Sequence, residues 1–101
     1  MIATITEQDG KYIAVLEGEM DTAAALDAEK TLQPLYKCDG HDVVIECEKL
    51  EYIASNGLRV LLSILKGAKT SGAKVTLRHV NADIKNVFRM TGFINLFEFE
   101  D

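Results

Sequence analysis

A short polar turn at residues 52–57 joins two segments with different patterns, and this junction limits what the chain can fold into. Upstream, residues 42–47 form an apolar run rich in β-branched side chains, which predicts a strand. Downstream, an apolar stripe recurs at helical spacing and predicts a helix from about 56 to 70. The stripe consists of Leu58, Leu61, Leu62, Leu65 and Ala68. Open α/β folds usually place their working groups at such strand-to-helix junctions.

The remaining segments continue this alternation of strands and helices. Residues 2–6 and 11–18 flank Asp9-Gly10, which predicts an antiparallel hairpin. The other expected elements are a helix from Asp21 or Thr22 to near Leu32, a strand over 74–80, a short helix after Asn81 and a strand over 93–100. The order ββαβαβαβ predicts a single α/β domain over residues 1–101. Its mixed sheet is antiparallel in the N-terminal hairpin, mostly parallel elsewhere, and covered by helices on at least one face.

Charge and apolar content exclude several classes of partner. The net charge of −5 provides no basic surface for nucleic acid or for an anionic membrane. No apolar run approaches the roughly 20 residues that span a bilayer. The first residues also lack the pattern of a signal peptide, so we expect a cytoplasmic protein.

Few residues suggest chemistry beyond binding. Cys38 and His41 form a Cys-x-x-His pair, but His79 is distant in sequence, and structural zinc requires four well-spaced ligands. We therefore predict no metal and no cofactor. Neither histidine has a nucleophile at a familiar spacing, and the glycines form no phosphate-binding pattern. The sequence predicts a protein that is not an enzyme.

Four short segments, in this order, resemble one known family. They are Gly18-Glu19-Met20-Asp21 before the first helix, Glu46 at the end of a strand nine positions before Ser55, the turn Ile53-Ala54-Ser55-Asn56-Gly57-Leu58, and Val87-Phe88-Arg89-Met90-Thr91-Gly92-Phe93. Together they resemble the sulfate transporter and anti-sigma factor antagonist (STAS) domain family, and within it the bacterial anti-sigma factor antagonists. The resemblance covers nearly the whole chain and implies a STAS-like fold.

The resemblance also implies a function. In the family, the serine matching Ser55 is phosphorylated by an anti-sigma factor serine kinase. The unmodified protein binds this kinase and frees a sigma factor, whereas the phosphorylated form does not. The alternative is a STAS regulatory or scaffold subunit of a transporter or stress-signalling complex that has no phosphoryl switch. In either case we expect a monomer or weak dimer, because the acidic strand containing Glu98 and Glu100 discourages edge pairing.

Several residues around the turn are candidates for partner binding, each with a structural alternative. Ser55 is either a phosphorylation site or a helix N-cap. Asp21 and Glu46 either lie near Ser55 or simply cap a helix and end a strand. A second strip of the helix, Val60, Ile64 and Gly67, either packs under a neighbouring element or forms an exposed docking strip beside Arg59 and Ser63. On the second interpretation, Ile64→Glu leaves the thermal midpoint nearly unchanged. The predicted partner-binding set is Asp21, Glu46, Ala54, Ser55, Asn56, Gly57, Arg59, Val60, Ser63 and Ile64.

Overall fold

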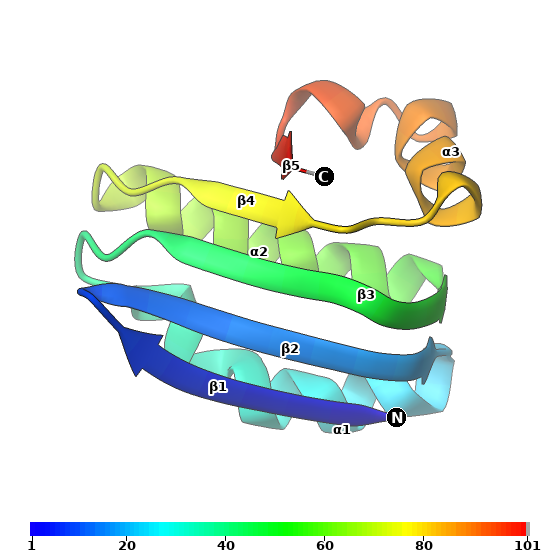
Figure 1. Ribbon diagram of the computed structural model, residues 1–101, viewed down its shortest axis with the longest axis horizontal. Helices are drawn as coiled ribbons and strands as arrows, with labels where there is room; N and C mark the ends of the chain where they lie inside the picture. The colour runs from blue at the N-terminus through cyan, green and yellow to red at the C-terminus, as the bar shows by residue number, and fades with distance from the viewer. Residues whose placement is uncertain (101) are drawn as a thin grey trace.

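The computed structural model describes residues 1–100, which form a five-stranded sheet packed against helices (Figure 1). The strands are β1 (Ile2–Gln8), β2 (Lys11–Met20), β3 (Val43–Ile53), β4 (Val75–Arg78) and β5 (Glu98–Glu100). The α-helices are α1 (Thr22–Leu32), α2 (Ser55–Thr70) and α3 (Ala82–Met90). Two short 3-10 helices, η1 (Gln33–Lys37) and η2 (Phe93–Asn95), follow α1 and α3. This order confirms the predicted ββαβαβαβ arrangement.

The strands lie in the sheet in the same order as in the chain, β1-β2-β3-β4-β5. β1 pairs antiparallel with β2, and all other neighbours are parallel. Asp9 and Gly10 at the hairpin turn both have positive φ, at 53° and 77°. This conformation matches the right-handed twist of the two strands and suits Asp-Gly. The mixed sheet predicted from the sequence is confirmed.

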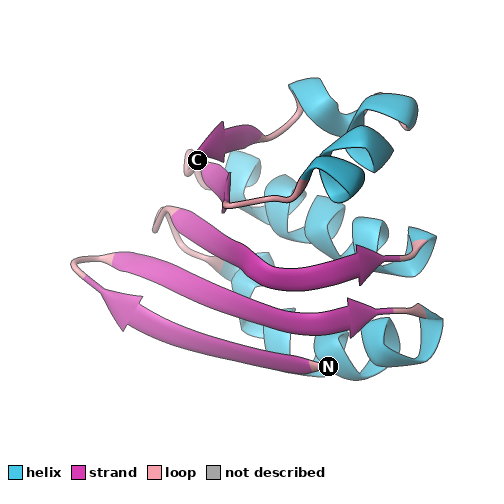
Figure 2. Ribbon diagram, turned by 45° about the vertical axis from the view of Figure 1, so that its right-hand side comes forward, coloured by secondary structure: helices cyan, strands magenta, loops and turns pink. Residues whose placement is uncertain are grey.

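Helices α1 and α2 pack on one face of the sheet, whereas the opposite face over β1 to β3 carries no helix in the described chain (Figures 1 and 2). Alternate residues of the strands point into the core between sheet and helices. They include Ala14 and Leu16 of β2, Val43 and Ile45 of β3, and Leu77 of β4, each fully buried. None of the helices in residues 1–100 is long and apolar enough to cross a membrane.

The first helix, α1, begins and ends where the sequence predicts. Asp21 is its N-cap, and the Asp21 Oδ1 atom accepts a hydrogen bond of 2.8 Å from the Ala24 N–H. The helix stops at Leu32, and Pro34 then lies in the first turn of η1, where its missing N–H costs no hydrogen bond. η1 continues the apolar side of α1 through the buried Leu35.

Two strands, β3 and β5, differ most in length from the prediction, and the lengths of the other three differ by up to three residues. β3 extends to Ile53 rather than ending at residue 47, because the buried Leu50 and Ile53 anchor its second half beside β2. The last strand is confined to residues 98–100, because Gly92 at φ 80° leads into η2 instead of a strand. The Phe88 ring of α3 contacts the rings of Phe97 and Phe99, with centroids 5.6 and 5.4 Å apart. These contacts hold the C-terminal segment against the core.

Candidate functional site

The turn before α2 is held by backbone bonds rather than by a side-chain cap. Ala54 occupies the N-cap position with extended φ and ψ of −89° and 171°, and it has no side-chain oxygen to bond the free N–H groups of the first turn. The Ala54 N–H donates to the Met20 carbonyl oxygen at 2.8 Å, and the Ala54 carbonyl oxygen accepts from the Leu58 N–H at 3.1 Å. The start of α2 is thereby tied to the end of β2.

Ser55 is the first helical residue of α2, and its side chain is exposed. Because Ala54 is the N-cap, the interpretation of Ser55 as the cap is wrong. Within residues 1–100 the Ser55 hydroxyl forms no side-chain hydrogen bond, in contrast to Ser63, whose Oγ atom donates to the Arg59 carbonyl oxygen at 3.0 Å. The hydroxyl is therefore accessible to a second molecule at the positive end of a helix dipole.

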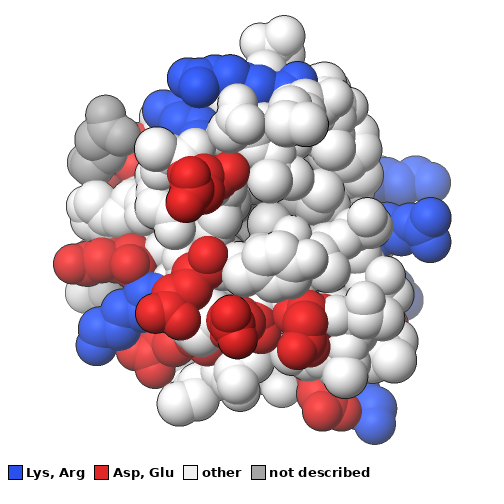
Figure 3. All heavy atoms as spheres, turned by 90° about the vertical axis from the view of Figure 1, so that its right-hand side faces the viewer, with Lys and Arg blue, Asp and Glu red and all other residues white. Residues whose placement is uncertain are grey.

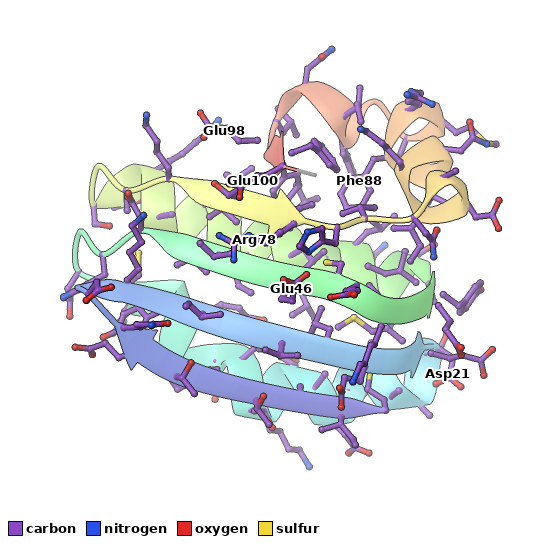
Figure 4. The ribbon with its side chains drawn as sticks, viewed as in Figure 1. Asp21, Glu46, Arg78, Phe88, Glu98 and Glu100 are labelled. Atoms are coloured by element: carbon purple, nitrogen blue, oxygen red, sulfur yellow. The ribbon has the colours of Figure 1, made fainter. Side chains whose placement is uncertain are left out.

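Asp21 lies beside this turn. Met20 and Ile53 are register partners at the carboxyl ends of β2 and β3, so the residues that follow them begin α1 and α2 at the same edge of the sheet. Asp21 is exposed there while it caps α1 (Figure 4). The structure thus supports both interpretations of Asp21, as a helix cap and as an acidic neighbour of the Ser55 turn.

Glu46 lies elsewhere, and its predicted place beside Ser55 is wrong. Because β3 extends to Ile53, Glu46 lies in the middle of the sheet on the open face, apart from Asp21 (Figure 4). Ile53 is seven residues further along the strand than Glu46, which is about 23 Å at the usual rise per residue. The Glu46 carboxylate instead accepts from the His79 Nδ1 atom, at 2.9 and 3.1 Å from its two oxygens.

The second apolar strip of α2 is buried, so the predicted docking role of Val60 and Ile64 is wrong. Val60 is 4% exposed and Ile64 is 0% exposed. α2 contacts α1 and η1 as well as the sheet, which gives the helix two buried sides. At Gly67 the backbone of Tyr36 approaches so closely that any added Cβ would overlap the Tyr36 carbonyl oxygen. The strip therefore packs under a neighbouring element, as the alternative interpretation expects.

Gly57, another residue of the predicted partner-binding set, is not on the surface. It is buried, and a Cβ there would lie 2.7 Å from the Ile53 Cγ1 atom and 2.9 Å from the Met20 Sδ atom. Distances below 3.0 Å between such atoms require one of them to move. Gly57 therefore lets the first turn of α2 approach the ends of β2 and β3 closely and sets the position of Ser55.

The exposed edge of α2 borders a shallow groove shared with α1. Its volume is about 120 Å³, and the lining residues are Ala25, Leu26, Glu29, Asn56, Arg59, Val60 and Ser63. Four of the predicted partner-binding residues therefore line this groove next to Ser55, namely the buried Val60 and the more accessible Asn56, Arg59 and Ser63. The sequence reasoning missed Leu26, whose side chain is 57% exposed. A large apolar residue outside the buried stripe of α1 was the signal that could have identified it.

One more polar contact holds α1 to η1 at the far end of this groove. The Tyr36 hydroxyl donates to the Glu29 Oε2 atom at 3.0 Å. Burial, followed by the hydrogen bond to Glu29 and the charge of Glu29, raises the pKa of Tyr36 to about 12. The phenol therefore stays protonated and keeps its donor role throughout the physiological pH range.

The end of the molecule that contains the turn is acidic. Exposed carboxylates lie near the ends of β2 and β3 and at the starts of α1 and α3, namely Glu19, Glu51, Asp21 and Asp83. The Asn81 amide donates to the Leu50 carbonyl oxygen at 3.1 Å, which places the start of α3 beside β3. Viewed from this end, acidic side chains gather over one part of the surface and basic ones lie toward its margins (Figure 3).

The arrangement has the features of a binding face. It contains an exposed hydroxyl, a shallow groove and an acidic surround. Comparison with known proteins decides the family. The model of the STAS domain family matches residues 3–101. The chain belongs to the STAS domain family. This confirms the resemblance found in the four sequence segments.

Relatives of this STAS domain extend the agreement to nearly the whole chain. BtrV of Bordetella bronchiseptica, described as an anti-sigma factor antagonist, is 31% identical over 97 residues, covering 96% of this chain and 84% of BtrV. The STAS domain protein of Planctomyces limnophilus has a TM-score of 0.87 at 14% identity, covering 98% of this chain and 89% of that one. The phosphorylated form of the Bacillus cell fate determinant SpoIIAA has a TM-score of 0.74 at 14% identity, covering 97% and 90%.

Membership in this family establishes the general kind of protein. Anti-sigma factor antagonists of the STAS family are binding proteins rather than enzymes, which agrees with the sequence-based prediction. The family implies protein partners. The curated relatives are bacterial.

Proposed function

We propose that this STAS domain is a phosphorylation-switched anti-sigma factor antagonist. Unmodified at Ser55, it binds an anti-sigma factor serine kinase and so frees a sigma factor. Phosphorylation of Ser55 by that kinase ends the binding. The docking face consists of the Ser55 turn, Asp21 and the exposed edge of α2 with Asn56, Arg59 and Ser63.

One observation supports this proposal above all others. The Ser55 hydroxyl is exposed and free of side-chain bonds in the described chain, at a helix end whose cap residue is an alanine. A phosphate there is stabilised by the free N–H groups and the dipole of α2. We therefore expect the fold to stay the same when the serine is modified. The modification changes the charge of the exposed surface instead.

The charge of a phosphate is large enough to act as a switch. It adds about −1.5 to −2 charges at neutral pH. A pair of like unit charges about 7 Å apart, at an effective dielectric near 20, costs roughly 2 kcal/mol, which is about thirtyfold in affinity. A phosphate opposite an acidic group of the partner would thus weaken binding by one to three powers of ten.

Phosphoryl transfer from the kinase tests the proposal. The partner is first isolated by co-purification with the unmodified protein and then incubated with labelled ATP and each variant. We expect wild type and Ser71→Ala to take up label, because Ser71 is exposed at the opposite end of α2. We expect Ser55→Ala to take up none. Equal labelling of Ser55→Ala and wild type would overturn the assignment of the site.

A STAS module without a phosphoryl switch is the second candidate, and Ala54 is the observation that favours it. Switched members of the family usually have an acidic residue before the serine, and this chain departs from that pattern with the half-buried Ala54. Such a module would bind a transporter ATPase or a scaffold through the same edge of α2. An absence of label on wild type, together with stable binding of the co-purified partner, would establish this second function.

A further inference from the structure

Three side chains of types that can bind a metal ion converge on the open face of the sheet, away from the Ser55 turn. Glu46 and Glu48 of β3 and His79 after β4 each offer one ligand atom, and these atoms all lie within 4.8 Å of one another. The His79 Nδ1 atom is already 2.9 Å from the Glu46 Oε2 atom. The sequence reasoning dismissed His79 because it lies far along the chain from Cys38 and His41. The sheet, however, brings it beside two carboxylates.

Strand alternation in β3 and the left-handed backbone of His79 after β4 bring these side chains together. Val15 pairs with Glu46 and Glu17 pairs with Lys49, so β3 contains one more residue than β2 between these pairs. Glu46 and Glu48 are two residues apart in β3 and so share the open face of the sheet, and the Glu48 N–H donates to the Glu46 Oε2 atom at 3.2 Å within this irregular stretch. Immediately after β4, His79 has a left-handed φ of 57°, and its N–H donates to the Glu100 carbonyl oxygen at 2.9 Å. The imidazole is thereby turned toward Glu46.

The two carboxylates lack a permanent cationic partner. In the part of the chain that the structure describes, neither Glu46 nor Glu48 forms an ion pair with lysine or arginine. Arg78 is the register neighbour of Glu46, but its Nε atom lies 3.2 Å from the Glu100 Oε1 atom. The charge of Glu46 also acts on the buried neighbouring residue Cys47. Burial first, and then Glu46, raises the pKa of the Cys47 thiol to about 12.

We propose that Glu46, Glu48 and His79 bind a divalent transition-metal ion of the Zn²⁺ type. Two carboxylates alone would suit Mg²⁺ or Ca²⁺, which take oxygen ligands, whereas an imidazole nitrogen selects ions such as Zn²⁺. Ligand atoms around tetrahedral zinc lie about 3.4 Å apart, so the widest separation must contract. The side chain of Glu48 is exposed and free to rotate toward the other two.

Metal binding would replace the hydrogen bond between His79 and Glu46. The His79 Nδ1 atom must be unprotonated to bind the ion, so the neutral ring carries its proton on Nε2. The hydrogen bond between His79 and Glu46 is then replaced by a bond from each residue to the metal. With three protein ligands, at least one coordination position remains for water or another ligand. The ion would tie the connection between β4 and α3 to β3.

Titration with Zn²⁺ alone tests the site on the whole protein after removal of metal by chelation. Isothermal calorimetry should give one Zn²⁺ per chain for wild type and at least about tenfold weaker binding for His79→Asn and Glu48→Gln. Asparagine tolerates the left-handed backbone of residue 79, and Glu48 is exposed, so both variants should fold. Backbone NMR shifts should change around residues 46–48 and 79.

His41→Ala is the matched control, because His41 lies in the loop before β3, where its Nδ1 atom bonds the Cys38 carbonyl oxygen at 2.8 Å. Zinc binding by this variant should equal that of wild type, and Mg²⁺ should bind far more weakly than Zn²⁺. Undiminished Zn²⁺ affinity of His79→Asn, equal affinity for Mg²⁺, or no binding at all would overturn the proposal. None of these results depends on phosphorylation of Ser55.

Discussion

The two sides of α2 have the same helical periodicity but opposite environments. On one side, Val60, Ile64 and Gly67 pack under α1 and η1, with Val60 and Ile64 buried and Gly67 half-buried. On the other, Ser55 and Arg59 remain exposed beside a shallow groove. The first side fixes the helix in place, and the second presents side chains to a partner.

This difference shows which property of a helix its own sequence controls. Spacing places residues on a common face. Whether that face is covered depends on elements distant in sequence, here η1, whose Tyr36 backbone lies against Gly67. A fixed, buried side keeps the exposed side in one geometry, which a binding face requires. The variants below act on one side or the other.

Ile64→Glu should have the largest effect. Ile64 is 0% exposed, so an unpaired carboxylate there would cost about 3–5 kcal/mol, a large share of the stability of a domain of this size. Circular dichroism during heating should show a much lower midpoint or an unfolded chain. Ser63→Glu, an exposed substitution one residue earlier, should melt like wild type. A wild-type midpoint for Ile64→Glu would restore the docking-strip interpretation.

Gly67→Ala should destabilise the protein although alanine favours helix. The propensity gain is about 1 kcal/mol, but the added Cβ overlaps the Tyr36 backbone, and overpacking should lower the net free energy of unfolding by about 2 kcal/mol. Urea unfolding measures the change, with the exposed neighbour Lys66→Ala as control. Increased stability of Gly67→Ala would mean that η1 does not pack closely on α2.

Arg59→Glu should affect binding and leave folding intact. Arg59 is exposed and lines the groove beside Ser55. Reversing its charge should weaken binding of the partner kinase by about tenfold. Lys66→Glu makes the same charge change on the same helix outside the groove, so its affinity should match that of wild type. Equal affinities of the two variants for the kinase would show that the groove is not part of the docking face.

Substitutions at Asp21 should have the smallest effect and separate its two roles. Asp21→Ala removes the cap of α1 and should cost about 1 kcal/mol of stability. Asp21→Asn keeps a capping oxygen without the charge, so its thermal midpoint should stay near that of wild type. Weaker kinase binding by Asp21→Asn would assign the charge to the interface. Unchanged binding would leave Asp21 as a cap only.

Local patterns in the sequence predicted most of the fold. Asp9-Gly10 indicated the hairpin, Asp21 and Asn81 indicated helix starts, and Pro34 indicated the end of α1. These signals work because each acts through a few neighbouring residues. The end of β3 was predicted too early, since the polar residues 48, 49 and 51 interrupt the apolar run while Leu50 and Ile53 remain buried.

The candidate site was predicted in part. The exposure of Ser55 and the grouping of Asn56, Arg59 and Ser63 follow from helical spacing, which the sequence contains. The burial of Ile64 and the location of Glu46 do not, because each depends on packing between segments far apart in the chain. The contact between Glu46 and His79 joins β3 to the residue after the neighbouring strand β4, 33 positions along the chain, and no local pattern indicates it.

The affinity of the partner kinase for wild type and for Ser55→Asp tests the central claim most directly. Calorimetry with the co-purified kinase should show binding one to three powers of ten weaker for Ser55→Asp. The thermal midpoint should not fall, because a carboxylate at the first turn of α2 suits the helix dipole. Equal affinities of the two proteins for the kinase would contradict the proposed switch.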